Sequence, residues 1–591
     1  MIKELSELGE RLREENSGSK IIHNAIKDEP VSIDLIIKED GTFVKFESIE
    51  KIMRPAEAIT AKKGKARLLL DKAEEVLSYN SDVKKHKLFM DKLDQYKELI
   101  QLKPVLNFYY DNEKNGIEKA IQAFEEQISE KERGGNIAFR LMSDDSRIHE
   151  KKEIYEAIIN KYEHSQAEKL SGTRITCSVC GKTDYPVEDT PHGMIKRVPD
   201  GQTSGCALVS YNEDAYESYN LKGNLNSAIC TNCARTYTEG LNWLMTNGNN
   251  LTIEDNKGKT KEIFRHTNRK NFNLADTAFI YWTRNSGSCN EINLLDEPDP
   301  GEVARLLESI YTAKKPADFN NDLFYSCTLS GAAARIAVRD WIAMSLADLK
   351  ISIAAWFNDI KILAWNEIYY PPLFRLVNAA QNQKNKNETT SARIALRLWN
   401  SAIKNTPPPL WILTAILKRV RLIEHNEDGK NKESITPERA ALIRLILNRN
   451  NKGGFMIKEK LDIESSSTAY LCGRIFAVLE SIQRSALGKD INAGIRERFF
   501  SFASTNPSSA FGRLMKMSQN HLTKLKGEKP GLAIILDKEL SELFSKINQF
   551  PPIFSLEEQG QFAIGYYHQK QDTFSRSKQN KELQDAVEVV E

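Results

Sequence analysis

Apolar and polar residues alternate near the start of the chain and then adopt a helical period. Ser32–Lys38 and Thr42–Glu47 are typical of two strands, and the Asp40-Gly41 step between them suits a tight hairpin. From Ala66 the spacing becomes helical. The apolar face of that predicted helix consists of Leu69, Leu70, Ala73, Val76 and Leu77, and further helices are predicted at 88–106 and 117–128. We therefore predict an N-terminal α+β domain over residues 1–170.

The periodicity disappears over residues 171–245, where Gly, Thr, Ser, Asn and Cys accumulate. This composition predicts a loop-rich module with short strands. Residues 246–455 are expected to be mainly helical, from Asn271 onwards. The helical segments are Ala332–Ile362, a long apolar-periodic stretch, followed by Ser391–Trp399 and Leu410–Leu422, which Pro407–Pro409 separate. The Gly-rich step at 452–454 ends this pattern.

Residues 456–575 are predicted to form a C-terminal helical bundle. Its expected helices are Thr468–Ser485, Ile491–Ser504, Ser508–Lys526, Leu532–Phe550 and Leu556–Gln571, and residues 576–591 are predicted to be a polar, frayed tail. At 591 residues the chain is too long for one core. The fold class is therefore α+β: an N-terminal α/β domain with an inserted four-cysteine, zinc-ribbon-like module, a mainly helical middle and the bundle.

Composition adds two constraints. The chain has 40% hydrophobic and 28% charged residues, with 83 basic and 81 acidic side chains and a net charge of +2. A nucleic-acid binder with this balance must gather its basic residues locally. Neither a bilayer-spanning apolar run nor a secretion signal is apparent, so we expect a cytoplasmic protein without a membrane partner.

Two cysteine pairs carry the clearest chemistry. Cys177 and Cys180, and Cys230 and Cys233, form a CxxC…CxxC pattern, in which each two-residue gap lets both sulfurs face one ion. The pattern predicts one structural Zn²⁺ held by four thiolates. A redox dithiol, an iron–sulfur cluster and free thiols are the alternatives. The other cysteines, Cys206, Cys289, Cys327 and Cys472, are scattered and are expected to be buried small hydrophobic residues.

A polar loop lies between the two cysteine pairs. Gly201 and Gly205 bracket Gln202, Thr203 and Ser204, and glycines let a loop approach another backbone closely. Amides such as those of Gln202 and Asn212 can bond base edges, and hydroxyl groups can bond phosphate. The alternative is a tight turn that enters a buried strand at 207–210.

Basic residues gather in three places, each of which can also be an ordinary solvated surface. Lys62, Lys63, Lys65 and Arg67 surround a glycine and suit a phosphate clamp. Arg513, Lys516, Lys524 and Lys526, together with Lys529, crowd one segment, and the third group is Arg393, Arg397, Lys418, Arg419 and Arg421. Enzyme motifs are lacking: neither a complete P-loop nor GxGxxG, HExxH or GxSxG occurs, so we predict no catalytic residues.

Several blocks together resemble the large subunit of the type I-C CRISPR Cascade effector complex. They occur in the family's order and span nearly the whole chain. The blocks are Arg67–Leu77 (RLLLDKAEEVL), Gly201–Asn212 (GQTSGCALVSYN) with Ala215–Tyr219 (AYESY), Leu329–Trp341 (LSGAAARIAVRDW), Ala469–Glu480 (AYLCGRIFAVLE) and Glu558–Gln569 (EQGQFAIGYYHQ).

The resemblance implies a non-catalytic subunit that recognises the protospacer-adjacent motif (PAM) in duplex DNA, assists R-loop opening and recruits a helicase–nuclease. Its implied partners are the backbone, crRNA 5′-end and small subunits of Cascade, together with target double-stranded DNA. In that setting the loop from Gly201 to Gly205, with Asn212, is expected to read the motif. The lysines near Lys62, with Arg67, are expected to hold duplex phosphates.

The C-terminal bundle resembles the family's small subunit, which escorts the displaced strand and can arise by internal translation. Met456 follows Gly453 and Gly454, whose codons can spell a purine-rich ribosome-binding sequence, so Met456 is the predicted internal start. Arg513, Lys516, Lys524 and Lys526 are the candidate contacts to that strand. The alternative functions are a zinc-ribbon nucleic-acid-processing enzyme or accessory factor outside CRISPR, and a purely structural interaction protein.

Overall fold

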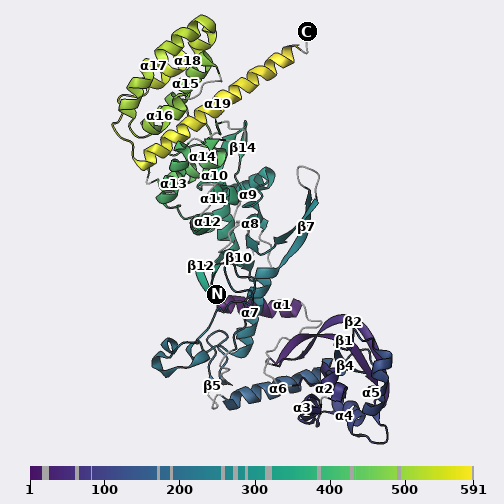
Figure 1. The fold of residues 1–591 in the computed structure, drawn as a ribbon. Coiled ribbons are helices and arrows are strands. Elements are labelled where there is room, and N and C mark those ends of the chain that lie inside the picture. Colours follow the sequence, from purple (N-terminus) through teal and green to yellow (C-terminus); the bar gives the residue numbers. More distant parts are fainter. Residues whose placement is uncertain are drawn as a thin grey trace. The chain divides into compact units, whose positions relative to one another are not determined.

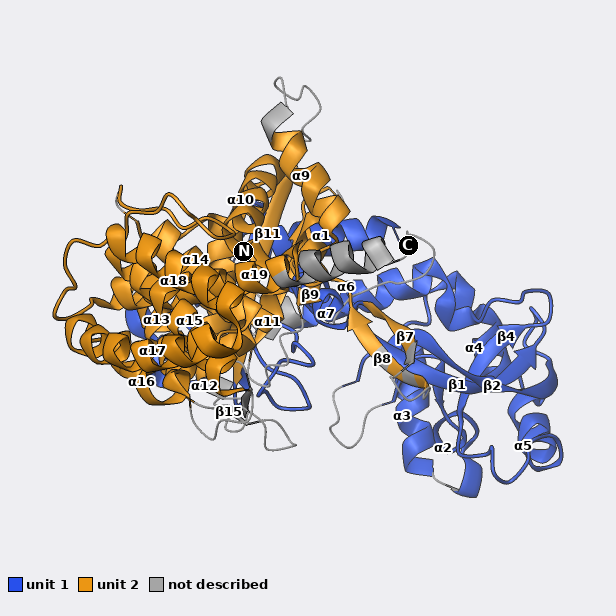
Figure 2. Ribbon diagram, turned by 90° about the horizontal axis from the view of Figure 1, so that it is seen from above, with its two compact units in different colours: residues 1–247, 332–336 blue, residues 248–331, 337–591 orange. Residues whose placement is uncertain are grey.

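The computed structural model describes the chain except for residues 16–24, 60–65, 82, 170–173, 187–190, 255–259, 271–276, 286–289, 313–321, 382–387, 423, 426–430, 433, 452, 489–493 and 589–591. It consists of two compact units, which Figure 2 shows in different colours. Unit 1 contains residues 1–247 with 332–336, and unit 2 contains residues 248–331 with 337–591. Each unit has its own apolar core, and the α+β fold class is confirmed.

The core of unit 1 contains a four-stranded mixed sheet. Its strands are β1 (Ile26–Ile37), β2 (Phe43–Glu57), β3 (Leu70–Lys72) and β4 (Asn136–Leu141), in the order β2-β1-β4-β3. The predicted hairpin is confirmed: β1 and β2 are antiparallel, and Gly41 turns between them with a φ of 90°. A parallel β4 completes the centre, so Ile33, Leu35 and Ile137 are fully buried.

Helices surround this sheet, and they can be followed in Figure 1. They are α2 (Ala73–Leu77), α3 (Val83–Asp94), α4 (Lys103–Tyr110), α5 (Gly116–Gln127) and α6 (Lys152–Lys169). Phe108, Phe124 and Phe139 form the aromatic centre of the core, with edge-to-face contacts such as Phe108–Phe139 at 5.8 Å. The predicted helices near 88–106 and 117–128 are thus present, the first of them divided into α3 and α4.

The helix predicted from Ala66 is wrong in its first half. Leu70–Lys72 is a strand that pairs with β4, and only Ala73–Leu77 is helical. Asp71 explains the difference, since its carboxylate accepts the backbone N–H groups of Arg67 (2.9 Å) and Lys72 (3.1 Å). A side chain that bonds the local backbone in this way competes with helix formation.

Helices α1 (Ile2–Glu15) and α7 (Thr231–Thr246) pack against each other within unit 1. Glycines allow the close approach: a Cβ on Gly9 would lie 2.0 Å from the carbonyl oxygen of Thr236, and one on Gly240 would lie 2.6 Å from that of Leu5. The Ser6 and Thr236 hydroxyls share a hydrogen bond of 2.6 Å in the buried interface. Arg13 adds two bonds of 2.9 Å to the Glu239 carboxylate.

Unit 2 contains a sheet that the sequence did not predict. Strands β9 (Arg269–Lys270), β10 (Ala278–Thr283), β11 (Leu323–Ala332) and β12 (Arg335–Ser345) lie in the order β12-β11-β10-β9. The prediction that 332–362 continues a helical region is therefore wrong for 332–345, and only Leu346–Ile360 is helical, as α10. Residues 324–331 of β11 are all buried, so the strand carries no alternating pattern.

The rest of the middle region is mainly helical, as predicted. Its helices are α8 (Asn290–Leu294), α9 (Pro300–Thr312), α10, α11 (Leu373–Ala379), α12 (Glu388–Lys404), α13 (Leu410–Arg421) and α14 (Pro437–Arg449). Three two-stranded pairs accompany them: β7 (Gly248–Glu254) with β8 (Thr260–His266), β13 (Ile362–Ala364) with β14 (Glu367–Tyr369), and β15 (Glu424–His425) with β16 (Asn431–Lys432).

The five predicted C-terminal helices are confirmed. They are α15 (Thr468–Leu487), α16 (Ile495–Ala503), α17 (Pro507–Glu528), α18 (Pro530–Ser545) and α19 (Leu556–Glu588), the last of which continues well past the predicted end at Gln571. Helices α15 and α19 cross through glycines. A Cβ on Gly473 would lie 2.0 Å from the carbonyl oxygen of Phe562, and one on Gly565 would lie 2.2 Å from that of Tyr470.

Helix α19 also packs against α13 and α14. The contact lies at Gly560, whose Cβ position is within 3.5 Å of the side chains of Leu413, Ile443 and Leu447. Among the described residues, no helix combines the length and the apolar character needed to cross a membrane.

Candidate metal centre and nucleic-acid interface

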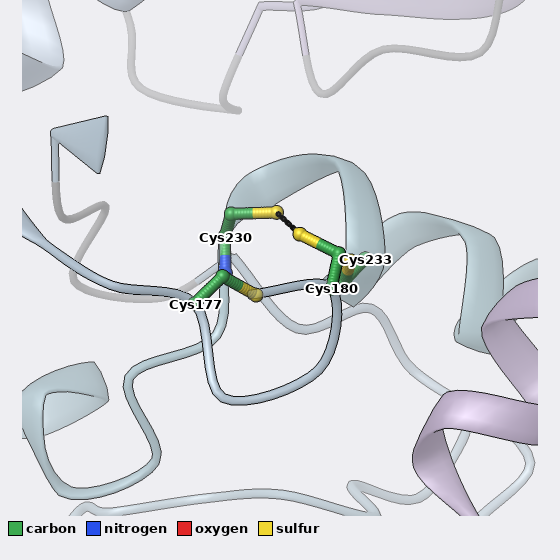
Figure 3. Close-up of side chains that lie close together, drawn as sticks. All are labelled: Cys177, Cys180, Cys230 and Cys233. Carbon is green, nitrogen blue, oxygen red and sulfur yellow. Dashed lines mark hydrogen bonds between the residues drawn. The ribbon is translucent and has the colours of Figure 1, made fainter. Parts of the chain in front are cut away.

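The four paired cysteines converge on one point in unit 1 (Figure 3). Their sulfur atoms all lie within 4.8 Å of one another, and those of Cys180 and Cys230 are 3.9 Å apart. A tetrahedral ion with metal–sulfur bonds of about 2.3 Å places its sulfurs about 3.8 Å apart. Cys177, Cys230 and Cys233 are buried and Cys180 is exposed. The cluster could therefore hold one metal ion.

Local backbone geometry directs the cysteines inward. Gly181 has a φ of 73° and closes the turn after the first pair, because its N–H donates to the carbonyl oxygen of Cys177 at 2.9 Å. The Cys177 sulfur accepts backbone N–H groups from Val179 (3.4 Å) and Cys230 (3.3 Å). The second pair begins α7, with Cys230 at the N-cap, where free N–H groups and the helix dipole favour negative charge.

This arrangement stabilises thiolate charge on one cysteine in particular. Hydrogen bonding from Cys233, the largest cause, and from Cys177 and Cys180 lowers the pKa of Cys230 to about 5. The same contact raises the pKa of Cys233, because two adjacent sulfurs cannot both carry charge cheaply without a cation. Thiolates are the metal-binding form of cysteine, so the charge pattern suits a soft divalent ion.

Polar side chains fix the segment between the two pairs. His192 bonds the Tyr237 hydroxyl through Nδ1 (2.9 Å) and the Asn224 amide oxygen through Nε2 (3.2 Å). Asn224 is fully buried and donates to the carbonyl oxygen of Ile229 at 2.8 Å, directly before the second pair. His192 is therefore a structural residue of this module, tying its loop to α7.

The backbone of the glycine-bracketed loop is held by the rest of unit 1, and the side chains at its tip are exposed. Gln202, Thr203 and Ser204 are exposed, whereas Gly205 and Cys206 are buried. Gly205 has a φ of 115°, and a Cβ on Gly201 would lie 2.4 Å from the Cys206 sulfur, so both positions require glycine. The expectation that Cys206, Cys327 and Cys472 are buried is confirmed, and Cys289 lies outside the described residues.

The support for this loop comes from the turn between β11 and β12, which belongs to unit 1. The Gln202 N–H donates to Ala333 (3.2 Å) and the Ala207 N–H donates to Ala334 (2.8 Å). The Ala207 carbonyl in turn accepts the Ile336 N–H at 3.0 Å. The loop is therefore anchored at both ends by short strand-like bonds, with the polar tips left free.

Arg335 is the residue of this region that sequence reasoning missed. Its guanidinium donates to the Asn212 amide oxygen and to the Tyr216 hydroxyl, and it lies 5.4 Å from the Tyr216 ring centre. These partners are 123 and 119 residues away in sequence, so spacing gave no signal. The only signal in the sequence was that Arg335 lies within Leu329–Trp341, one of the blocks that resemble the family.

Tyr219 is the second unpredicted feature. It is 93% exposed and has a φ of 69°, in the left-handed region that bulky residues rarely adopt. Both properties are unfavourable for an ordinary surface tyrosine, and the residue lies on the same segment as Tyr216 and Asn212. An exposed ring held in a strained backbone is typical of a contact residue.

The predicted phosphate clamp is only partly described. Lys62, Lys63 and Lys65 lie outside the described residues. Arg67 is mostly buried and forms ion pairs with Glu29 (3.0 Å) and Asp71 (3.6 Å). Its charge is therefore already balanced within the N-terminal domain.

The basic residues of the bundle divide between two faces of α17. Arg513, Lys516 and Lys524 are exposed and fall within an arc of about 80° at 3.6 residues per turn. Lys526 lies on another face and pairs with Asp537 of α18 at 3.2 Å, and Lys524 has a weaker pair with Glu528 at 3.8 Å. Met456 is exposed in the segment before α15.

Residues 5–574 match the family model described as CRISPR-associated protein (Cas_Csd1). The comparison with curated proteins gave no match. The match covers nearly the whole chain, which defines its class: a CRISPR-associated protein that is a Cascade subunit. More particularly, the chain belongs to the Cas_Csd1 family, the large subunits of the type I-C complex, and the resemblance seen in the sequence blocks is confirmed.

Proposed function

We propose that the chain is the non-catalytic large subunit of a cytoplasmic, crRNA-guided type I-C interference complex. In this proposal it recognises the protospacer-adjacent motif in duplex DNA, assists R-loop opening and recruits the helicase–nuclease. It joins the backbone, crRNA 5′-end and small subunits of Cascade. The observation that carries motif recognition is the loop at 202–204, because three exposed polar side chains stand on a backbone bonded at both ends.

Chemistry supports a division of roles within this loop. The free amide of Gln202 can bond a base edge, while Thr203 and Ser204 can bond phosphate or sugar. Asn212 uses its amide oxygen to accept from Arg335, so we assign it a supporting role. Arg335 and the exposed Tyr219 ring bring a positive charge and a stacking surface to the same segment.

The test is alanine at Gln202 in the complex assembled with its guide RNA. Duplexes that differ only in the motif compete for binding, and Gln202→Ala is expected to reduce discrimination by about 1–3 kcal/mol while total affinity changes less. The matched control is Gln519→Ala, an exposed glutamine of α17. Unchanged motif preference in Gln202→Ala would refute the assignment.

We propose that Lys62, Lys63 and Lys65, with Arg67, hold the duplex backbone. The charge of Arg67 is already balanced by Glu29 and Asp71, so the three lysines are expected to contribute more to phosphate binding than Arg67. Alanine at the lysines is expected to weaken all duplexes alike and to reduce the salt dependence of binding. Equal losses for lysine and Arg67 variants without a change in salt dependence would contradict this view.

The metal of the cysteine cluster is proposed to be Zn²⁺. Cys177, Cys180, Cys230 and Cys233 supply the four thiolates of a closed tetrahedral site, which leaves no position for water. When bound, the ion cross-links the two cysteine pairs. The hydrogen bonds of the chain's own residues then hold the polar loop in a fixed position relative to α7.

We propose that residues 456–591 also exist as a separate small subunit that starts at Met456. Arg513, Lys516 and Lys524 on the common face of α17 would contact displaced-strand phosphates, with Lys526 secondary because it pairs with Asp537. Met456→Leu is expected to remove the small product from a gel while the full chain remains. An undiminished small product would exclude this start.

The absence of catalysis belongs to the same proposal. Metal-dependent cleavage of nucleic acid by the purified chain would favour the alternative, a zinc-ribbon enzyme outside interference. Co-purification with guide RNA and other Cascade subunits favours the subunit assignment.

A further inference from the structure

Unit 2 contains a cavity of about 900 Å³ that none of the proposed roles uses. Its walls are the β7–β8 hairpin, the segment before α9, the β13–β14 hairpin and the start of α11, all within unit 2. Figure 1 shows where these elements lie in the chain. Aromatic side chains line much of it: Phe264, Trp365, Tyr369, Tyr370 and Phe374.

Trp365 lines this cavity in a strained backbone conformation. Ala364 pairs with Glu367, which leaves Trp365 and Asn366 as a two-residue turn with φ angles of 52° and 73°. Turns with two positive φ angles normally contain Asn-Gly or Asp-Gly, because larger side chains are strained there. Trp365 is also 59% exposed. A strained and exposed indole indicates a contact role.

Arg269 is a cation of the cavity wall that has no ion-pair partner among the described residues. It lines the wall and is half-buried, and burial alone lowers its pKa, with no carboxylate contributing. Two neighbouring acids are already engaged: Asp296 pairs with Lys270 at 2.8 Å, and Glu297 pairs with Arg265 at 2.9 Å. Within the described part of the chain, no ion pair or side-chain hydrogen bond reaches the Arg269 guanidinium.

The other charged side chains of the lining form no ion pair with Arg269 among the described residues. Asp299 accepts the Glu302 N–H at 2.8 Å as the cap of α9, and Arg375 donates to the Tyr369 hydroxyl at 3.2 Å. Glu367 is exposed at the hairpin tip. A half-buried guanidinium without a counter-ion favours an anionic ligand, and Arg is the residue best suited to phosphate.

We propose that this cavity binds one nucleotide of a single-stranded nucleic acid, with the base stacked on Trp365 and a phosphate on Arg269. The volume lies within the roughly 300–1,000 Å³ of pockets that take small organic ligands. Every base offers a π face, so stacking needs no particular sequence. An acidic peptide segment is the competing occupant, and the absence of single-strand binding by the parent chain would favour it.

This inference goes beyond the proposed function and does not depend on the Gln202 loop. The nucleotide can come from displaced DNA or from guide RNA, which share base and phosphate chemistry. Short fluorescein-labelled DNA and RNA homopolymers distinguish the two when their anisotropy is measured with the full chain at low salt. The two proposals fail separately, because Trp365→Asn is measured on single strands and Gln202→Ala on discrimination between duplexes that differ only in the motif.

The decisive variant is Trp365→Asn. It is expected to weaken single-strand binding about tenfold. It should keep or raise the melting temperature, since Asn tolerates the positive φ. Arg269→Gln is expected to weaken binding several-fold and to lower its salt dependence. The matched control is Trp411→Ala, an exposed tryptophan of α13 outside the cavity, which should bind like the parent chain.

Photocrosslinking identifies the site directly. An oligonucleotide containing 5-iodouracil is expected to crosslink to Trp365, Tyr369 or Tyr370, as mapped by mass spectrometry. Single-strand affinity that Trp365→Asn leaves intact, the absence of any single-strand binding by the parent chain, or crosslinks confined to other surfaces would each overturn the proposal.

Discussion

The cysteine module of unit 1 and the C-terminal bundle of unit 2 are stabilised in different ways. Between Arg174 and Ile229, the buried apolar side chains among the described residues are Cys177, Pro191, Ile195, Val198, Cys206 and Ile229. Helix α15 alone buries 15 of its 20 residues. The module therefore depends on a few specific links, whereas the bundle depends on many small apolar contacts.

The few links of the module fix the positions of individual residues, whereas the many contacts of the bundle make its fold tolerant of single changes. In the module, the cysteine sulfurs, the glycine turns and the His192–Asn224 hydrogen bond each fix one point, and the side chains of residues 202–204 stay exposed. In the bundle, apolar packing leaves charged residues such as Arg513 on a stable surface. Small cores need such cross-links, while large ones tolerate the loss of single contacts better.

The largest expected effect comes from removing one link of the module. Cys233→Ser should abolish stoichiometric metal binding, since structural zinc sites contribute roughly 10–16 kcal/mol of apparent binding free energy. Metal content and limited proteolysis of residues 174–230 measure the loss. Cys472→Ala in α15 is the control and should retain the metal. Equal metal content in both variants would remove the basis for the comparison.

A smaller effect is expected in the bundle, where a single added methyl group tests the helix crossing. Gly473→Ala and Gly565→Ala place a Cβ against a facing carbonyl oxygen, and each should destabilise by about 1–3 kcal/mol in urea unfolding. Gly512→Ala is the matched control in α17, where nothing lies within 4 Å. It should stabilise by about 1 kcal/mol. Similar destabilisation by all three would show that the crossing is not tightly packed.

The smallest effect at neutral pH concerns His568 inside the bundle. Burial first, and then the charges of Arg444 and Arg474, lower the pKa of His568 to about 3. The unfolded chain binds the proton more readily, so stability is full above about pH 6.5 and falls as the pH drops towards 3. The slope is at most about 1.4 kcal/mol per pH unit.

His568→Gln should flatten this acid dependence, as followed by thermal unfolding at several pH values. The control is His164→Gln, which removes an exposed histidine of α6. If the acid slope of His568→Gln equalled that of the parent, protonation of His568 would not limit the bundle.

The bundle and the cysteine cluster could be predicted from the sequence because their signals are local. Regular apolar spacing predicted α15–α19, and the two CxxC pairs predicted the four cysteines whose sulfur atoms lie within 4.8 Å of one another. Helix α19 was predicted too short, because the residues after Gln571 are polar and offered no apolar period.

The failures arose where tertiary contacts decide the structure. Strand β11 is buried along nearly its whole length, and a continuous apolar run does not distinguish strand from helix. Leu69 adopts a φ of 64° and Asp71 bonds the backbone, so the apparent helix at Ala66 starts late. The bonds from Arg335 to Asn212 and Tyr216 join distant segments and leave no mark in a single sequence.

The position of Gly560 has a consequence for any polypeptide that begins at Met456. Such a product would retain α15–α19 but lack α13 and α14, so Leu413, Ile443 and Leu447 would no longer shield this side of α19. The same residues of α19 would then form an apolar stripe that is exposed to solvent in the short form and shielded from solvent in the long form. The short form would need a neighbour to cover that stripe, whereas the long form carries its own cover.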